Sequence, residues 1–98
     1  MMYTLNIDQP ALTLFKKLPK HIQTILIAKA QVLKTNPHAG EPLKGKYRLL
    51  RSLPLSIEGT AYRMIDQLFH KSETLVIRLA APRENIYRQL DEMKRSSE

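Results

Sequence analysis

The chain has 98 residues, with 16 Lys and Arg against 9 Asp and Glu, and it contains no Cys. This length predicts one domain spanning residues 1–98 and excludes a two-domain organisation. The lack of cysteine excludes a disulfide framework, a thiolate nucleophile and a cysteine-ligated metal site. No apolar run approaches the ~20 residues of a membrane span, and the N-terminus lacks the pattern of a signal peptide. We therefore expect a soluble, cytoplasmic protein.

The net charge of +7 is unevenly distributed along the sequence. No acidic residue occurs from Gln9 to Gly40, and a second acid-free cluster contains Lys44, Lys46, Arg48 and Arg51. Such one-signed stretches attract phosphates, acidic proteins or anionic membrane surfaces. They predict a polyanionic or acidic partner, and the alternative is a solvated basic face that only keeps the protein soluble.

The N-terminal part of the chain predicts one strand followed by two helices. Residues 3–7 alternate as a short strand does, Asp8 is a helix cap, and Pro10 falls in the first helical turn. Apolar spacing predicts this helix and a second one over residues 21–35. Residues 36–42 are rich in Pro and Gly and predict a loop. The two helices should form an antiparallel hairpin that covers one face of a sheet.

The remainder predicts three strands and a final helix. The period changes to two over residues 49–57, 61–69 and 74–80, with short polar turns between them. Pro54 is a flaw in the first of these strands, because Pro cannot donate to a ladder and belongs at a sheet edge or a bulge. Residues 84–94 predict a helix with one apolar side. The order β-α-α-β-β-β-α defines an α+β domain with a meander of three antiparallel strands.

Three short segments follow one another in a recognisable order and spacing. They are Leu43-Lys44-Gly45 before a basic strand, Ala61-Tyr62-Arg63-Met64-Ile65, and Val76-Ile77 running to Pro82-Arg83-Glu84-Asn85-Ile86-Tyr87-Arg88. Together they resemble the RelE/ParE superfamily of toxins from bacterial type II toxin–antitoxin modules, and the resemblance covers nearly the whole chain. It implies a cognate acidic antitoxin as partner.

The resemblance also implies an activity, that of the RelE branch, whose members enter the ribosomal A site and cut messenger RNA. The catalytic positions that it implies are an Arg on the middle strand, an Arg near the end of the last strand, a Tyr early in the final helix and a basic residue on the first meander strand. In this sequence they fall on Arg63, Arg83, Tyr87 and Arg51. Contacts to the ribosome and mRNA are expected from Lys44, Lys46, Arg48 and Tyr47, the last as an exposed aromatic side chain.

Metal-free RNA cleavage requires the ribose 2′-OH to attack the adjacent phosphate, with a base, an acid, and cations for the phosphorane charge. Arg63 and Arg83 suit the electrostatic role, since a guanidinium stays charged and binds two phosphate oxygens. Alternatively, they form ordinary ion pairs with Asp66 and Glu84. Tyr87 would act as the base, stack on an RNA base, or pack at a helix–sheet seam. The three histidines are scattered without ligand spacing, so we expect no metal and no cofactor.

Two other functions remain open at the level of sequence. One is a ParE-like inhibitor of DNA gyrase without a catalytic step, and the other is a degenerate relative that only binds its antitoxin. Pro82 and Asp66 depart from the pattern of the RelE branch. The first meander strand offers arginines in place of lysines, and arginine is a poor proton donor.

Overall fold

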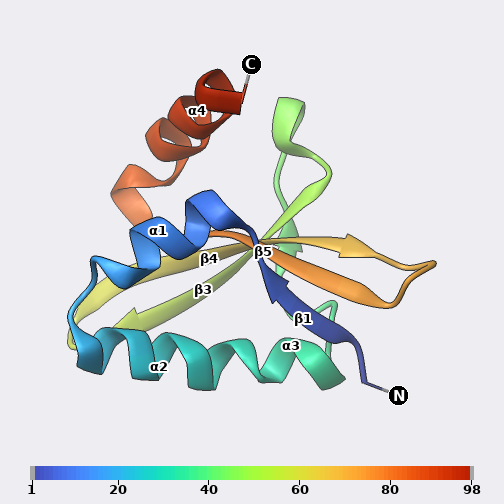
Figure 1. The fold of residues 1–98 in the computed structure, drawn as a ribbon, viewed down its shortest axis with the longest axis horizontal. Coiled ribbons are helices and arrows are strands. Elements are labelled where there is room, and N and C mark those ends of the chain that lie inside the picture. Colours follow the sequence, from blue (N-terminus) through green and yellow to red (C-terminus); the bar gives the residue numbers. More distant parts are fainter. Residues whose placement is uncertain (1, 98) are drawn as a thin grey trace.

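The computed structural model describes residues 2–97 and consists of a five-stranded sheet with helices on both faces (Figure 1). The sheet has the order β1-β5-β4-β3-β2, and only the β1–β5 pair is parallel. The strands are β1 (Thr4–Ile7), β2 (Glu41–Pro42), β3 (Leu50–Ile57), β4 (Thr60–Phe69) and β5 (Thr74–Pro82). The α-helices are α1 (Gln9–Lys16), α2 (Lys20–Ala30), α3 (Val32–Thr35) and α4 (Ile86–Ser97). The predicted α+β fold with an antiparallel meander is therefore confirmed.

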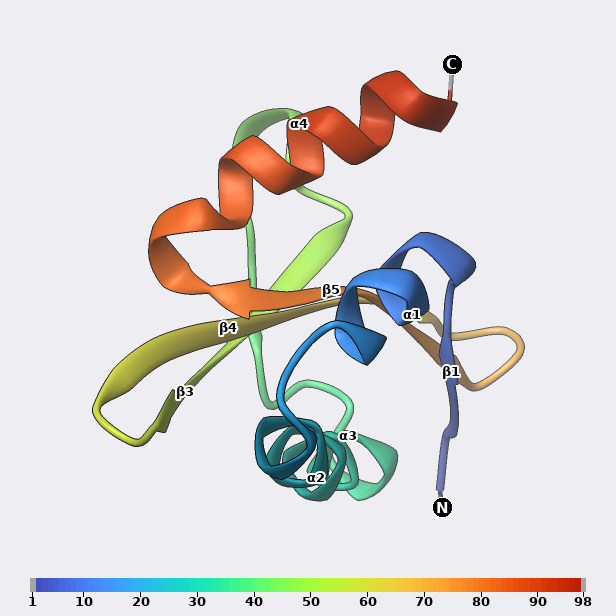
Figure 2. The same cartoon turned by 60° about the vertical axis from the view of Figure 1, so that its left-hand side comes forward.

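Two hydrophobic cores lie on opposite faces of the sheet. Helices α2 and α3 cover one face and α4 covers the other (Figure 2). We call these the α2 face and the α4 face. Side chains alternate between faces along a strand, and directly paired residues share a face. The α2-face core includes Leu26, Leu33, Met64, Leu75 and Ile77, and the α4-face core includes Ile65, Leu79, Ala81, Ile86 and Leu90.

A β-bulge at Arg78 explains how β5 contributes to both cores. In the register between β4 and β5, Ile65 pairs with Leu79 and Asp66 pairs with Ile77, so Arg78 is the extra residue. One extra residue reverses the alternation of side chains. Ile77 therefore packs on the α2 face, whereas Leu79 packs on the α4 face.

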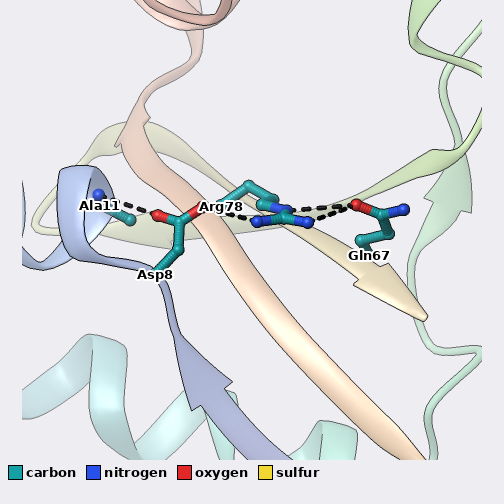
Figure 3. Close-up of polar contacts among 4 residues, drawn as sticks. All are labelled: Asp8, Ala11, Gln67 and Arg78. Atoms are coloured by element: carbon teal, nitrogen blue, oxygen red, sulfur yellow. Dashed lines mark hydrogen bonds and ion pairs between the residues drawn. The ribbon is translucent and has the colours of Figure 1, made fainter. Parts of the chain in front are cut away.

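The Arg78 side chain connects three elements of the fold (Figure 3). Its Nη1 donates to Asp8 Oδ2 at 2.9 Å, while its Nε and Nη2 donate to Gln67 Oε1 at 3.2 and 2.8 Å. Asp8 Oδ1 in turn accepts a hydrogen bond from the backbone N–H of Ala11 at 3.0 Å, so Asp8 is the N-cap of α1 as predicted. The network fixes the start of α1 to β5 and β4.

Several predicted boundaries differ from the observed ones. The second helix is interrupted at Gln31, which separates α2 from α3. Strand β2 falls inside the predicted loop, where Gly40 allows close approach: a Cβ on Gly40 would lie 2.8 Å from the Ser52 carbonyl oxygen. Strand β5 continues to Pro82, because a proline at the last strand position removes no required donor. A 3₁₀ turn, η2 (Arg83–Asn85), precedes α4.

Candidate functional site

The predicted catalytic residue Arg63 lies on the α4 face of β4. It pairs with Pro54 on β3 and with Ala81 on β5. Its half-buried guanidinium donates from Nη1 to Ser52 Oγ at 2.9 Å. Asp66 lies on the opposite face, and the described residues form no ion pair between Arg63 and Asp66. The Arg63 guanidinium is therefore hydrogen-bonded to a neutral hydroxyl, and no carboxylate among the described residues neutralises its charge.

Arg83 and Tyr87 both follow the end of β5, Arg83 in η2 and Tyr87 in the first turn of α4. Arg83 follows Pro82, which pairs with Tyr62, the chain neighbour of Arg63. Arg83 is exposed, and within the described chain it makes no ion pair with Glu84. Tyr87 comes four residues later, and its side chain is 55% exposed. These positions leave both side chains accessible to a ligand.

A shallow hollow of about 480 Å³ adjoins this end of the sheet. It lies where the hairpin between β3 and β4 meets the end of β5. The residues that line it are Gly59, Thr60, Ala61, Pro82, Arg83 and Glu84. Arg83 is therefore the positively charged residue that lines this hollow, and Glu84 is the negatively charged one.

The structure does not bring Arg51 to this site. Arg51 pairs with Asp66 on the α2 face, and its Nη2 donates to the backbone carbonyls of Gly40 and, at 3.4 Å, His38. Since Arg63 lies on the other face, the two guanidinium groups are separated by the sheet. The prediction that Arg51 acts beside Arg63 is wrong, and Arg51 instead holds the loop before β2 against the sheet.

Asp66 is an acidic residue buried within the α2 face. Its side chain is fully buried, and neither carboxylate oxygen has a hydrogen-bond partner among the described residues. Burial raises the pKa of Asp66 from 3.8 to about 6, while the charge of Arg51 lowers it. The sequence contained a signal for this burial, because Asp66 shares the strand parity of Met64 and Leu68.

The prediction that Tyr47 is an exposed aromatic is wrong. Tyr47 lies in the 3₁₀ turn η1 (Gly45–Tyr47), is only 9% exposed, and its hydroxyl donates to Asp91 Oδ1 on α4. Burial, followed by the effects of Asp91, raises the pKa of Tyr47 to about 12. Its ring centroid lies 6.2 Å from that of Tyr87. Tyr47 is thus part of the support for α4, the helix that carries Tyr87.

The other cations near η1 are exposed, as an RNA contact requires. Lys44, Lys46 and Arg48 all reach solvent. Lys46 Nζ lies 3.0 Å from Asp91 Oδ1, but both side chains are exposed by 60% and 42%. A surface ion pair of this kind contributes little to stability. The assignment of these three residues to ribosome and mRNA binding stays a prediction.

Loss of the Tyr47 hydroxyl should loosen the packing of α4. We expect Tyr47→Phe to lower the free energy of unfolding by about 1 kcal/mol, because the Asp91 carboxylate loses a donor. Urea denaturation followed by circular dichroism measures this change. Tyr62→Phe is the matched control, since the described residues give the Tyr62 hydroxyl no hydrogen bond, and its effect should stay below about 0.5 kcal/mol. Equal losses in the two variants would contradict the role of Tyr47.

Within residues 2–97, no group of three or more His, Cys, Asp or Glu side chains is placed to hold a metal ion. In the same part of the chain, no helix is long and apolar enough to cross a membrane.

Solved structures that are similar to this chain include bacterial and archaeal toxins. The toxin–antitoxin complex RelBE2 of Mycobacterium tuberculosis contains a chain with 26% identity and a TM-score of 0.72; the match covers 85% of this chain and 93% of that one. A double arginine-to-alanine mutant of the Escherichia coli toxin RelE in the free state has 22% identity and a TM-score of 0.75, with 97% and 98% covered. The RelE–RelB complex of Pyrococcus horikoshii gives 21% identity and a TM-score of 0.59, with 85% and 97% covered.

The sequence itself identifies the family. The family model of ParE-like toxins of type II bacterial toxin–antitoxin systems matches residues 5–91. No curated protein matches the sequence. The chain therefore belongs to the ParE-like toxins, which confirms the resemblance to the RelE/ParE superfamily.

Proposed function

We propose that this toxin is a ribosome-dependent endoribonuclease that cleaves mRNA and so inhibits translation. The observation that carries the proposal is the arrangement of Arg63, Arg83 and Tyr87 at one end of the sheet. Arg63 is held without a carboxylate partner among the described residues, and Arg83 and Tyr87 are exposed where the chain leaves β5, the strand whose Ala81 pairs with Arg63. Two guanidinium groups without a carboxylate partner in the described chain, together with an accessible phenol, suit a phosphodiester substrate.

In the proposed reaction, the ribose 2′-OH attacks the adjacent phosphorus, and the bond to the 5′-oxygen of the next nucleotide breaks. Arg63 and Arg83 stabilise the charge that develops on the phosphorane oxygens, because guanidinium donors bind two oxygens at once. Tyr87 accepts the 2′-OH proton or stacks on an RNA base. Because arginine is a poor proton donor, the leaving 5′-oxygen takes its proton from water or from RNA.

The proposed partners are the ribosome, mRNA and a cognate acidic antitoxin, all in the cytoplasm. Three of the similar solved structures are toxins bound to antitoxins, in Mycobacterium tuberculosis, Escherichia coli and Pyrococcus horikoshii. The acid-free stretch from Gln9 to Gly40 covers α1, α2 and α3, so the charged side chains of these three helices are all basic. Such a surface favours an acidic protein or RNA.

Primer extension on a programmed ribosome complex tests the proposed activity. Purified folded toxin should produce new mRNA ends confined to the A-site codon, and naked mRNA should stay intact. Cleavage of naked mRNA at the same positions would contradict the dependence on the ribosome. No cleavage in either reaction, with a protein shown to be folded by circular dichroism, would overturn the proposal.

A second candidate function is inhibition of DNA gyrase without catalysis. The observations that favour it are the match to the ParE-like family and the position of Arg51, which removes one cation from the proposed catalytic set. A supercoiling assay with purified gyrase distinguishes the two functions. Inhibition of supercoiling that persists in an Arg63→Ala, Tyr87→Phe double variant would favour the gyrase function.

A further inference from the structure

Ser52 is a buried polar residue next to the candidate site. Its side chain is 2% exposed, and it lies on the α4 face of β3 opposite Ile65. On its other side Ser52 pairs with Glu41 of β2. Gly40, which precedes Glu41 in the chain, lies so close to β3 that a Cβ on Gly40 would clash with the Ser52 carbonyl. Strands on both sides therefore fix the backbone of Ser52.

The Ser52 hydroxyl meets the guanidinium of Arg63. Ser52 Oγ accepts a hydrogen bond from Arg63 Nη1 at 2.9 Å. An arginine side chain has many rotamers, and ordering it in one of them costs conformational entropy. A fixed acceptor on the neighbouring strand selects one orientation in advance. Because a guanidinium has five N–H donors, this single bond leaves the remaining donors for a ligand.

The surroundings of Arg63 preserve its charge for that ligand. Pro54, the residue directly opposite Arg63 on β3, has no charge and is exposed, so it leaves access from the edge of the sheet. A carboxylate in place of Ser52 would neutralise the guanidinium and compete with a phosphate. A hydroxyl orients Arg63 without this competition.

We propose that Ser52 is a positioning residue: it orients the Arg63 guanidinium to bind two oxygens of a phosphate group. For the cleavage reaction this role rests on the proposed function, since the phosphate would be the scissile group of mRNA. The role of Ser52 in anion binding does not rest on that function and depends only on the contact between Ser52 and Arg63.

A double-mutant cycle on cleavage separates positioning from a general structural role. We expect Ser52→Ala to slow cleavage about 10-fold at saturating ribosome concentration in the wild-type background, and less than 2-fold in the Arg63→Ala background. Ser52→Thr keeps the hydroxyl and should restore most of the rate. Equal slowing in both backgrounds, or no slowing in either, would overturn the proposal.

Phosphate binding provides a readout that does not need catalysis. The Nε–Hε NMR signal of Arg63 is followed while inorganic phosphate is added to wild-type protein and to Ser52→Ala. The wild-type signal should shift with an affinity several-fold higher than that of the variant. Equal affinities overturn the role of Ser52 even if the ribonuclease is active. Unequal affinities support it even if no cleavage occurs, in which case only the proposed function fails.

Discussion

Replacement of Arg63 by alanine is expected to reduce A-site mRNA cleavage by about 10²–10³-fold, the usual effect of removing one preorganised transition-state donor. The guanidinium of Arg63 is held at the sheet by Ser52 and has no carboxylate partner among the described residues, so its charge is available for the phosphorane. The rate of appearance of cut mRNA under single-turnover conditions measures the effect. A loss of less than about 5-fold would show that Arg63 is not part of the site.

Two control variants separate charge from folding. Arg63→Gln keeps an N–H donor for Ser52 but removes the charge, and it should be as inactive as Arg63→Ala. Arg78→Ala removes an arginine of similar exposure on the neighbouring strand, where the guanidinium binds Asp8 and Gln67. This change should lower stability by about 1–3 kcal/mol and leave the cleavage rate of the folded protein unchanged. The two arginines are thereby assigned to different roles.

Asp66 is expected to make the protein more stable in mild acid than at neutral pH, relative to an Asp66→Asn variant. The folded-state pKa of Asp66, about 6, lies above its ordinary value of 3.8, so the folded protein binds this proton more tightly than the unfolded chain does. The ionised carboxylate therefore destabilises the fold above pH 6. Protonation removes this cost as the pH falls from about 6 to about 4.

The size of this effect follows from the shift in pKa. One pKa unit corresponds to 1.36 kcal/mol, so the wild type should gain about 2–3 kcal/mol over Asp66→Asn between pH 7 and pH 4. Urea denaturation at a series of pH values measures both proteins. When the free energy of unfolding of the variant is subtracted from that of the wild type at each pH, the contributions of all titrating groups that the two proteins share cancel. Parallel pH profiles would mean that Asp66 is solvated or paired in the folded protein.

The hydrophobic periodicity of the sequence is sufficient to predict the fold. It is not sufficient to predict which of the candidate site residues lie on the same face of the sheet. The alternation that predicted β3 also placed Arg51 in phase with Leu53 and Leu55, which pack on the α2 face. The family resemblance implied a catalytic role for Arg51, whereas the parity of Arg51 with Leu53 and Leu55 puts it on the α2 face, away from Arg63. The same parity puts Ser52 and Pro54 on the face of Arg63, and the hydrogen bond from Arg63 selects Ser52.

Other features depend on contacts that no local pattern contains. Tyr47 lies in a turn between basic residues, and its burial results from α4, whose Asp91 is 44 positions away in the chain. Phe69 is a large apolar residue in a strand of the sheet, yet it is 38% exposed at the last position of β4. The bulge at Arg78 interrupts an otherwise regular apolar run, and it becomes visible only in the register between β4 and β5.

That bulge has a consequence for the cooperativity of unfolding. Strands β4 and β5 supply side chains to both cores, and on β5 the change of face takes place within three residues, from Ile77 to Leu79. Each core alone is small, and a small core buries too little apolar surface to be stable by itself. Separation of β5 from β4 would therefore expose both cores at once. The two faces of the sheet should unfold in a single transition, so that α4 and the residues it carries share the global stability of the domain.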